Sequence, residues 1–158
     1  MSRTRSDIDH DLAVRASFGV WQRTPESRLH GDIAWNPDEL TSLLRIIPSV
    51  AFKRGETPRN EPLAPFTRTS EAWDHSLWSL ESDSHVQSTN LVDHVEWLLQ
   101  QLYPGKDILR AYISESELEA DVLCFLSVQS QVGVRLELDV LERLVELALP
   151  IDFDIYGS

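Results

Sequence analysis

The chain has 158 residues, enough for one domain with a substantial core and too few for two ordinary ones. Its formal net charge is −12, unevenly placed: residues 1–70 carry ten Lys/Arg against nine Asp/Glu, whereas residues 71–158 carry four against 17. Such an acidic field repels nucleic-acid phosphates and anionic membranes and speeds association with a basic protein, although solubility alone is the simpler explanation. We therefore expect no nucleic acid and no membrane among the partners.

The cysteine content and the hydropathy pattern bear on the cellular compartment. Cys124 is the single cysteine, so no intramolecular disulfide can form, which favours a reducing compartment. The residues after Met1 are polar and do not form the apolar segment of a secretory signal. No apolar run reaches the roughly 18 residues that span a bilayer. We therefore expect a cytoplasmic protein.

Hydrophobic periodicity predicts a single domain over residues 11–158, after a polar lead over residues 1–10. Alternating apolar residues indicate strands, and apolar residues three and four positions apart indicate helices. Three prolines mark residues 56–70 as a loop. In chain order, the predicted strands cover residues 11–21, 29–35, 49–52, 73–82, 121–128 and 151–156, and the predicted helices cover residues 36–47, 88–102, a short segment within 106–118, and 138–148.

Two of these elements make definite predictions about burial. The strand over residues 121–128 is apolar in both of its alternating phases, so we expect it to be central and covered on both faces. The helix over residues 138–148 carries an apolar stripe that we expect to be buried. The stripe consists of Leu141, Leu144, Val145 and Ala148.

These elements together predict an α+β domain of two layers, with about three helices packed on one face of a mixed β-sheet. If the helices cover one face, the other face of the sheet is partly open. Strand alternation places six side chains on that open face as a candidate surface for a partner. They are Arg15, Trp21, Trp78, Asp152, Asp154 and Tyr156.

Candidate catalytic and metal-binding residues are few. Asp152 and Asp154 share one strand face and could do acid–base work or hold a divalent cation, but a solvated face or pairing with Arg15 is the simpler explanation. His75 and His94 could join them in a hydrolytic site, although they do not have the helical spacing of a paired zinc ligand. We therefore predict no catalytic residue, no bound metal and no cofactor.

Seven short segments follow one another in a specific order. They are His30-Gly31-Asp32, Asn36 to Leu40, Ile46-Ile47-Pro48, Lys53 to Glu56, Trp78-Ser79-Leu80, Leu91 to Leu102, and Leu144 through Tyr156. In this order they resemble the bacterial domain-of-unknown-function family 4279 over most of residues 11–156. The resemblance implies a small, single-domain, cytoplasmic bacterial protein, and it implies a fold without a reaction. Small acidic bacterial domains of this kind have been suggested as immunity proteins in toxin systems.

Three functional hypotheses remain at this point. The charge, the acidic and aromatic strand face and the lack of a catalytic constellation favour a non-enzymatic protein-interaction module, in concrete form an immunity protein that neutralises a basic partner. The alternative is a small-ligand or divalent-metal-binding domain with hydrolytic activity. The third is a homo-oligomer that associates through open sheet faces or edges.

Overall fold

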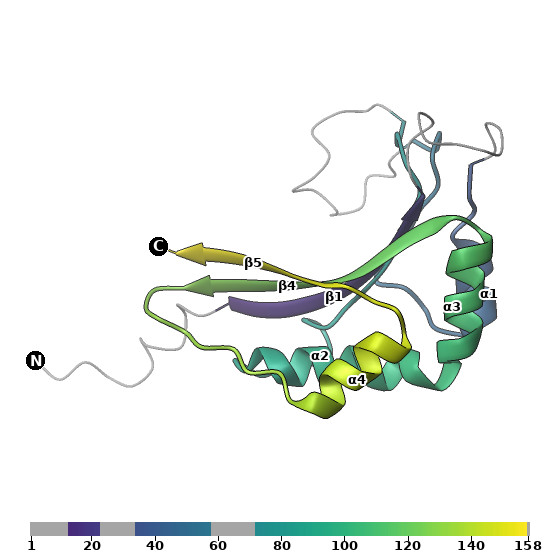
Figure 1. The fold of residues 1–158 in the computed structure, drawn as a ribbon. Helices are drawn as coiled ribbons and strands as arrows, with labels where there is room; N and C mark the ends of the chain where they lie inside the picture. The colour runs from purple at the N-terminus through teal and green to yellow at the C-terminus, as the bar shows by residue number, and fades with distance from the viewer. Residues whose placement is uncertain (1–12, 23–33, 58–71, 158) are drawn as a thin grey trace, which may run out of the picture.

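The computed structural model of the chain describes residues 13–22, 34–57 and 72–157. In these residues a five-stranded mixed sheet with the order β2-β3-β1-β4-β5 carries helices on one face (Figure 1). The predicted α+β fold is thereby confirmed. The strands are β1 (Ala13–Gln22), β2 (Val50–Phe52), β3 (Leu77–Glu81), β4 (Leu118–Val128) and β5 (Ile151–Gly157), and the helices are α1 (Asp38–Leu44), α2 (Leu91–Leu102), the short 3-10 helix η3 (Tyr103–Gly105), α3 (Lys106–Glu115) and α4 (Leu138–Glu146).

The centre of the sheet is the long antiparallel pair of β1 and β4. The two strands are in register from Ala13 opposite Ser127 to Gln22 opposite Leu118. β3 continues the sheet on the other side of β1, and β5 runs parallel to β4 after the crossover through α4. The parallel pair needs this crossover because a tight turn can join only antiparallel strands.

The helical layer is anchored by α2. Asn90 caps its start by accepting a hydrogen bond from the Val92 N–H at 3.2 Å. α2 packs mainly on β1 and beside α4. The predicted helix is confirmed, and one side of it is buried. Its buried side chains are Leu91, His94, Val95, Leu98, Leu99 and Leu102.

One buried polar chain links α2 to the sheet. The Nε2 of His94 lies 2.7 Å from the Ser88 carbonyl, which can only accept, so Nε2 donates to it. Nδ1 is hydrogen-bonded to the Ser82 hydroxyl at 2.7 Å, and the oxygen of this hydroxyl accepts the Ala16 N–H at 2.9 Å. His94 is therefore a satisfied core residue.

The buried face of α4 differs from the prediction. Val140 and Leu144 face the core, and Leu147 follows them, whereas Leu141 is 38% exposed and Val145 76% exposed. Apolar residues occupy two phases of this helix, so sequence periodicity cannot choose between them. Packing against the core selects the phase of Val140 and Leu144.

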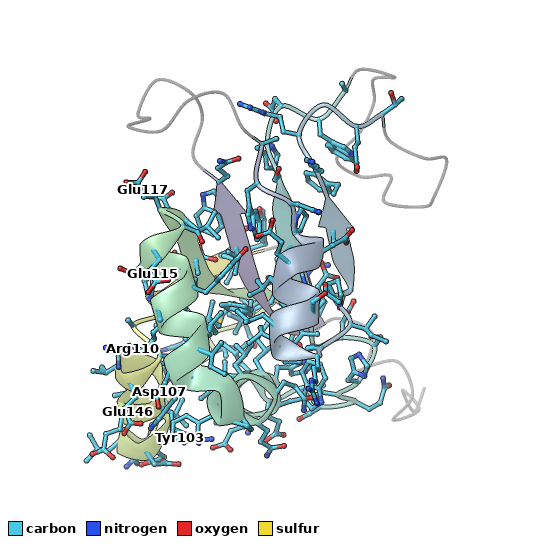
Figure 2. The ribbon with its side chains drawn as sticks, turned by 90° about the vertical axis from the view of Figure 1, so that its right-hand side faces the viewer. Tyr103, Asp107, Arg110, Glu115, Glu117 and Glu146 are labelled. Atoms are coloured by element: carbon cyan, nitrogen blue, oxygen red, sulfur yellow. The ribbon has the colours of Figure 1, made fainter. Side chains whose placement is uncertain are left out.

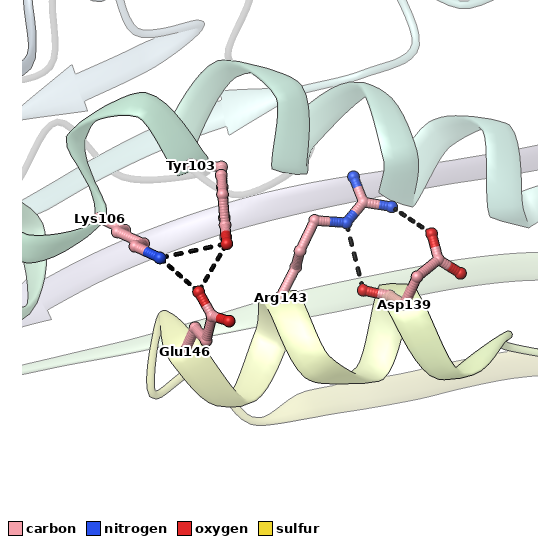
Figure 3. A network of polar contacts seen from close by, with 5 residues as sticks. All are labelled: Tyr103, Lys106, Asp139, Arg143 and Glu146. Atoms are coloured by element: carbon pink, nitrogen blue, oxygen red, sulfur yellow. Dashed lines mark hydrogen bonds and ion pairs between the residues drawn. The ribbon is translucent and has the colours of Figure 1, made fainter.

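Polar contacts join α4 to its neighbours. Arg143 binds Glu96 on α2 at 3.1 Å and Asp139 within α4 at 3.1 Å. Glu146 binds the Lys106 ammonium of α3 and accepts a hydrogen bond from the Tyr103 hydroxyl at 2.6 Å (Figure 3). The pKa of Lys106 is raised, chiefly by this carboxylate. The contacts lie on one side of α4 and are partly exposed, so they add little to the burial that orients the helix.

Several predicted boundaries move. The helix expected to end at Pro48 ends at Leu44, because Arg45 adopts a left-handed φ of 56° and donates its N–H to the Thr41 carbonyl at 2.9 Å. The segment 106–118 is mostly the ten-residue helix α3, and β4 starts at Leu118.

Two predicted elements concern residues outside the described ranges. Residues 34 and 35 belong to no strand, and the rest of the predicted strand over 29–35 is not described. The polar lead and most of the proline-rich loop also lie outside the described residues. Within the described part of the chain, no helix is both long enough and apolar enough to cross a membrane.

Candidate functional site

The surface of the sheet opposite the helices, called the open face below, collects side chains from every strand. Pairing register arranges its central part in rows that run across β1, β4 and β5. The rows are Arg15 with Phe125 and Asp154, Ser17 with Leu123 and Asp152, Gly19 with Asp121, and Trp21 with Glu119. Leu123 is 40% exposed, so the prediction that this strand is covered on both faces is wrong.

An aromatic row, made of Arg15, Phe125, Asp154 and Tyr156, crosses one end of the open face. The Arg15 guanidinium lies 4.8 Å from the centre of the Phe125 ring, and this ring lies 5.2 Å from that of Tyr156. The Tyr156 hydroxyl donates to Asp154 Oδ2 at 3.0 Å, and this bond raises the pKa of Tyr156. The four side chains form one connected polar and aromatic surface.

An acidic cleft of about 410 Å³ lies at the other end. β5 begins opposite Val122, so the first residues of β4 have no strand on that side, and the cleft fills this notch beside α3. Its polar lining residues and its one aromatic ring are Trp21, Arg110, Ser114, Glu119, Asp121 and Asp152. Arg110, the single cation among the described residues that line it, extends from α3 on the side of α4 (Figure 2).

Gly19 has no side chain, so the sheet surface between Trp21 and Asp121 stays open. A Cβ at this position would lie 3.7 Å from Asp121 Oδ1 and 3.8 Å from the Trp21 ring. The Trp21 indole N–H donates to Glu119 Oε2 at 3.0 Å, which orients the ring beside the cleft. The aromatic ring and the carboxylates therefore share one small surface.

Two carboxyl groups meet in the cleft. Asp121 on β4 and Asp152 on β5 both line the cleft, and the pKa of Asp121 is raised to about 6 by partial burial, then by the nearby Asp152 and by the charge of Glu119. Neighbouring carboxylates repel each other when both are ionised, which favours the protonated form of one of them. A bound cation would remove this repulsion.

The structure brings together five of the six predicted surface residues. Arg15, Trp21, Asp152, Asp154 and Tyr156 lie on the open face. Their role in binding a partner stays a prediction.

The sixth residue, Trp78, was predicted on the wrong face. Its side chain is fully buried, its ring packs edge-on against Phe18 at 5.9 Å, and its indole N–H donates to Thr41 at 2.9 Å. Leu77 takes the outward position on β3.

The residues named for the hydrolytic alternative are not brought together. His94 is buried on the helical side of the sheet, and His75 lies beside Asp74 with 2.5 Å between Nδ1 and Oδ1. In the described ranges, no group of three or more His, Cys, Asp or Glu side chains is arranged to hold a metal ion. Burial raises the pKa of the Cys124 thiol to about 12, so this residue is no nucleophile at neutral pH.

Sequence reasoning missed Glu119, Asp121, Phe125 and Arg110. The signal for the first three was present: once β4 is extended back to Leu118, one phase contains both acids and Phe125, and the other is apolar throughout. Arg110 carries no such signal, because only the packing of α3 beside β4 brings it to the cleft.

The comparisons with known proteins identify a family. A family model described as "Domain of unknown function (DUF4279)" matches residues 15–158, nearly the whole chain. The chain belongs to this family, and the resemblance noted in the sequence is confirmed. No curated protein and no solved structure matches the chain.

Proposed function

We propose that this member of the DUF4279 family is a protein-interaction module whose open face binds a basic protein, with a Lys or Arg side chain of that protein entering the acidic cleft. The observation that carries the proposal is that three carboxylates, those of Glu119, Asp121 and Asp152, line one cleft. We place the interaction in the cytoplasm, where the single buried cysteine stays reduced.

A basic side chain matches the chemistry of the cleft. An ammonium or guanidinium group can donate to both carboxylates at once, and charge-assisted hydrogen bonds of this kind are about twice as strong as neutral ones. The Trp21 ring offers a flat wall for the aliphatic stem of Lys or for the plane of Arg. Binding would also remove the repulsion between Asp121 and Asp152.

The extent of the open face favours a protein over a small ligand. Beyond the cleft, Leu123 and the aromatic row continue the surface across three strands, and Tyr156 is 52% exposed. Aromatic and apolar side chains ringed by polar groups are typical of the centre of a protein interface. The charge of residues 71–158 would steer a basic partner toward this face.

An immunity protein is the concrete form that we favour. Such a protein would cover the basic, substrate-binding surface of a toxin with the open face and would need no catalytic residue of its own. The acidic charge of the chain supports this form.

The test begins with capture of the tagged chain's partner from its native cells at about 50 mM and about 300 mM salt. The recovered basic protein is then purified and its affinity is measured by calorimetry. We expect the double variant Asp121→Asn/Asp152→Asn to weaken binding at least about tenfold, because each lost charged contact is worth about 1.5–3 kcal/mol.

The matched control is Asp107→Asn/Glu142→Gln, which changes the net charge equally at exposed helical sites. Equal affinity of the two double variants would show that general charge, and not the cleft, binds the partner. Binding of Mg²⁺ or Ca²⁺ to the parent chain, lost in Asp121→Asn/Asp152→Asn, would replace this proposal by the divalent-cation alternative.

A further inference from the structure

The two edges of the sheet differ in how they are protected. β2 is three residues long, follows Pro48 closely and is followed by Lys53. β5 has seven residues, begins directly after Pro150 and carries Asp152 and Asp154 but no Lys or Arg. In the described part of the chain, β5 pairs only with β4. Because β5 is more than twice as long as β2, it offers more unpaired backbone groups as a template for another strand.

The outward backbone groups of β5 follow from its register. The Val122 N–H donates to the Pro150 carbonyl at 2.9 Å, and Val122 lies opposite Ile151. Alternation along a parallel pair then directs the backbone groups of Asp152, Asp154 and Tyr156 toward β4. The outward N–H and C=O groups belong to Ile151, Phe153, Ile155 and Gly157.

Apolar side chains accompany these outward groups. Phe153 is 43% exposed and Ile155 60% exposed. Both point to the helical side of the sheet, beyond the reach of the core. Burial of these two side chains would add hydrophobic stabilisation to the backbone hydrogen bonds of a new strand.

α4 extends the same surface into the helical layer. Arg143 and Glu146 occupy the side of α4 toward α2, η3 and α3 (Figure 3), and the opposite side points away from these helices. That side carries Leu138, 75% exposed, together with Leu141 and Val145. β5 and α4 lie on the same side of the molecule in Figures 1 and 2. Both layers of the fold therefore expose apolar groups at this edge.

We propose that two copies of the chain pair antiparallel through β5, with Ile155 of one copy opposite Ile155 of the other. This register joins outward groups to outward groups and places Phe153 opposite Gly157. It also places Asp154 opposite Tyr156, the same two side chains that already hydrogen-bond within one copy. β5 is thus complementary to itself.

The neighbouring registers are disfavoured by charge. Centring the pair on Phe153 puts Asp152 opposite Asp154, and centring it on Asp154 puts that carboxylate opposite its own copy. Like charges directly opposite each other destabilise a strand pair. The register centred on Ile155 avoids both clashes.

The resulting interface is small, so the dimer should be weak. Five residues of one strand pair with five residues of the other. The area that they bury lies at the low end for specific interfaces unless α4 adds to it. Each copy also carries a net charge of −12, so repulsion opposes association and salt relieves it. Salt should therefore strengthen the dimer, whereas it should weaken binding of a basic partner.

Light scattering over a concentration series, at about 50 mM and about 500 mM salt, tests the association. We expect the mean mass to rise from 18.0 kDa toward twice that value as the protein concentration increases. In high salt this rise should occur at a protein concentration at least about threefold lower than in low salt. Ile155→Lys, which places two ammonium groups opposite each other, should abolish the rise, whereas Val50→Lys on the β2 edge should not. A mass of 18.0 kDa under all conditions would overturn the proposal.

Cysteine cross-linking tests the register. In this dimer the two Ile155→Cys positions form a hydrogen-bonded pair with Cα atoms about 5.5 Å apart, a distance that a disulfide spans. Phe153→Cys lies opposite Gly157 and should not cross-link. Cys124 is buried and does not interfere. Cross-linking through residue 153 and not 155 would contradict the proposed register, and a disulfide in neither variant would contradict pairing through β5.

Discussion

The two faces of the sheet are built from the same strands by opposite physical rules. On the helical face, Phe18, Val20 and Val122 are fully buried, and the buried polar groups of His94 and Ser82 are satisfied. On the open face, carboxylates lie beside one another and aromatic rings remain accessible. The first arrangement stabilises the fold, whereas the second keeps electrostatic repulsion that a proton or a bound cation would relieve. The contrast separates the face that stabilises the fold from the face that we propose for recognition.

The strongest test of this comparison replaces one tryptophan on each face by alanine. Trp78→Ala should lower the free energy of unfolding by about 4 kcal/mol, because it empties a fully buried site and leaves Thr41 without its donor. Trp21→Ala should lower it by no more than about 1 kcal/mol. Urea denaturation followed by circular dichroism measures both, and equal losses would contradict the division of roles.

A second test removes the buried polar chain of the helical face. His94→Ala should cost about 3 kcal/mol of unfolding free energy, since the Ser82 hydroxyl and the Ser88 carbonyl both lose a buried partner. His85→Ala is the control, because His85 is exposed and only stacks on Trp97 at 4.5 Å. Thermal denaturation that shifts equally in both variants would refute the structural role of His94.

On the open face, removal of a charge should stabilise the chain. The pKa of Asp121 is about 6 when folded and 3.8 ordinarily, so the folded state holds the proton more tightly. The contribution of this group is fully present below pH 3.8 and is lost as the pH rises through about 6. The substitution Asp121→Asn should therefore raise the free energy of unfolding by about 1 kcal/mol at pH 8, a value discounted for solvent screening. At pH 4 it should change the free energy of unfolding little. Denaturation at the two pH values gives the difference, and a gain of equal size at both would contradict the raised pKa.

The smallest expected effect concerns the cation at the cleft. Arg110→Gln should raise the affinity for the basic partner about threefold, because it removes from the cleft a positive charge that repels that partner. Calorimetry at low salt measures the change. The control is Arg135→Gln, at an exposed site in the segment just before α4, which should leave the affinity nearly unchanged.

Local patterns in the sequence predicted the elements better than their faces. The α2 stripe and the β1 alternation each have one apolar phase, so both were placed correctly. Leu77 and Trp78 are both apolar, and alternation alone cannot say which of them faces the core. The buried face of α4 was predicted wrongly for the same reason, because apolar residues occupy two phases of the helix and only packing against the core selects one of them.

The candidate site depends on register, which no local pattern carries. Asp152 was predicted on the open face from its own strand. It shares the cleft with Asp121 only because β5 pairs in parallel with β4 and starts opposite Val122. The acidic cleft could therefore not be assembled from sequence, although half of its carboxyl pair could be named.

The proximity of Asp121 to Asp152 also gives the proposed interaction a thermochemical signature. Near pH 6 about half of the Asp121 carboxyls hold a proton, and a cation that enters the cleft would displace it into the solvent. The heat of binding would then include the ionisation heat of the buffer, so that phosphate and imidazole buffers report different enthalpies at the same affinity. Titrations in the two buffers would give the number of protons released on binding. This number would report cation binding in the cleft without a mutation.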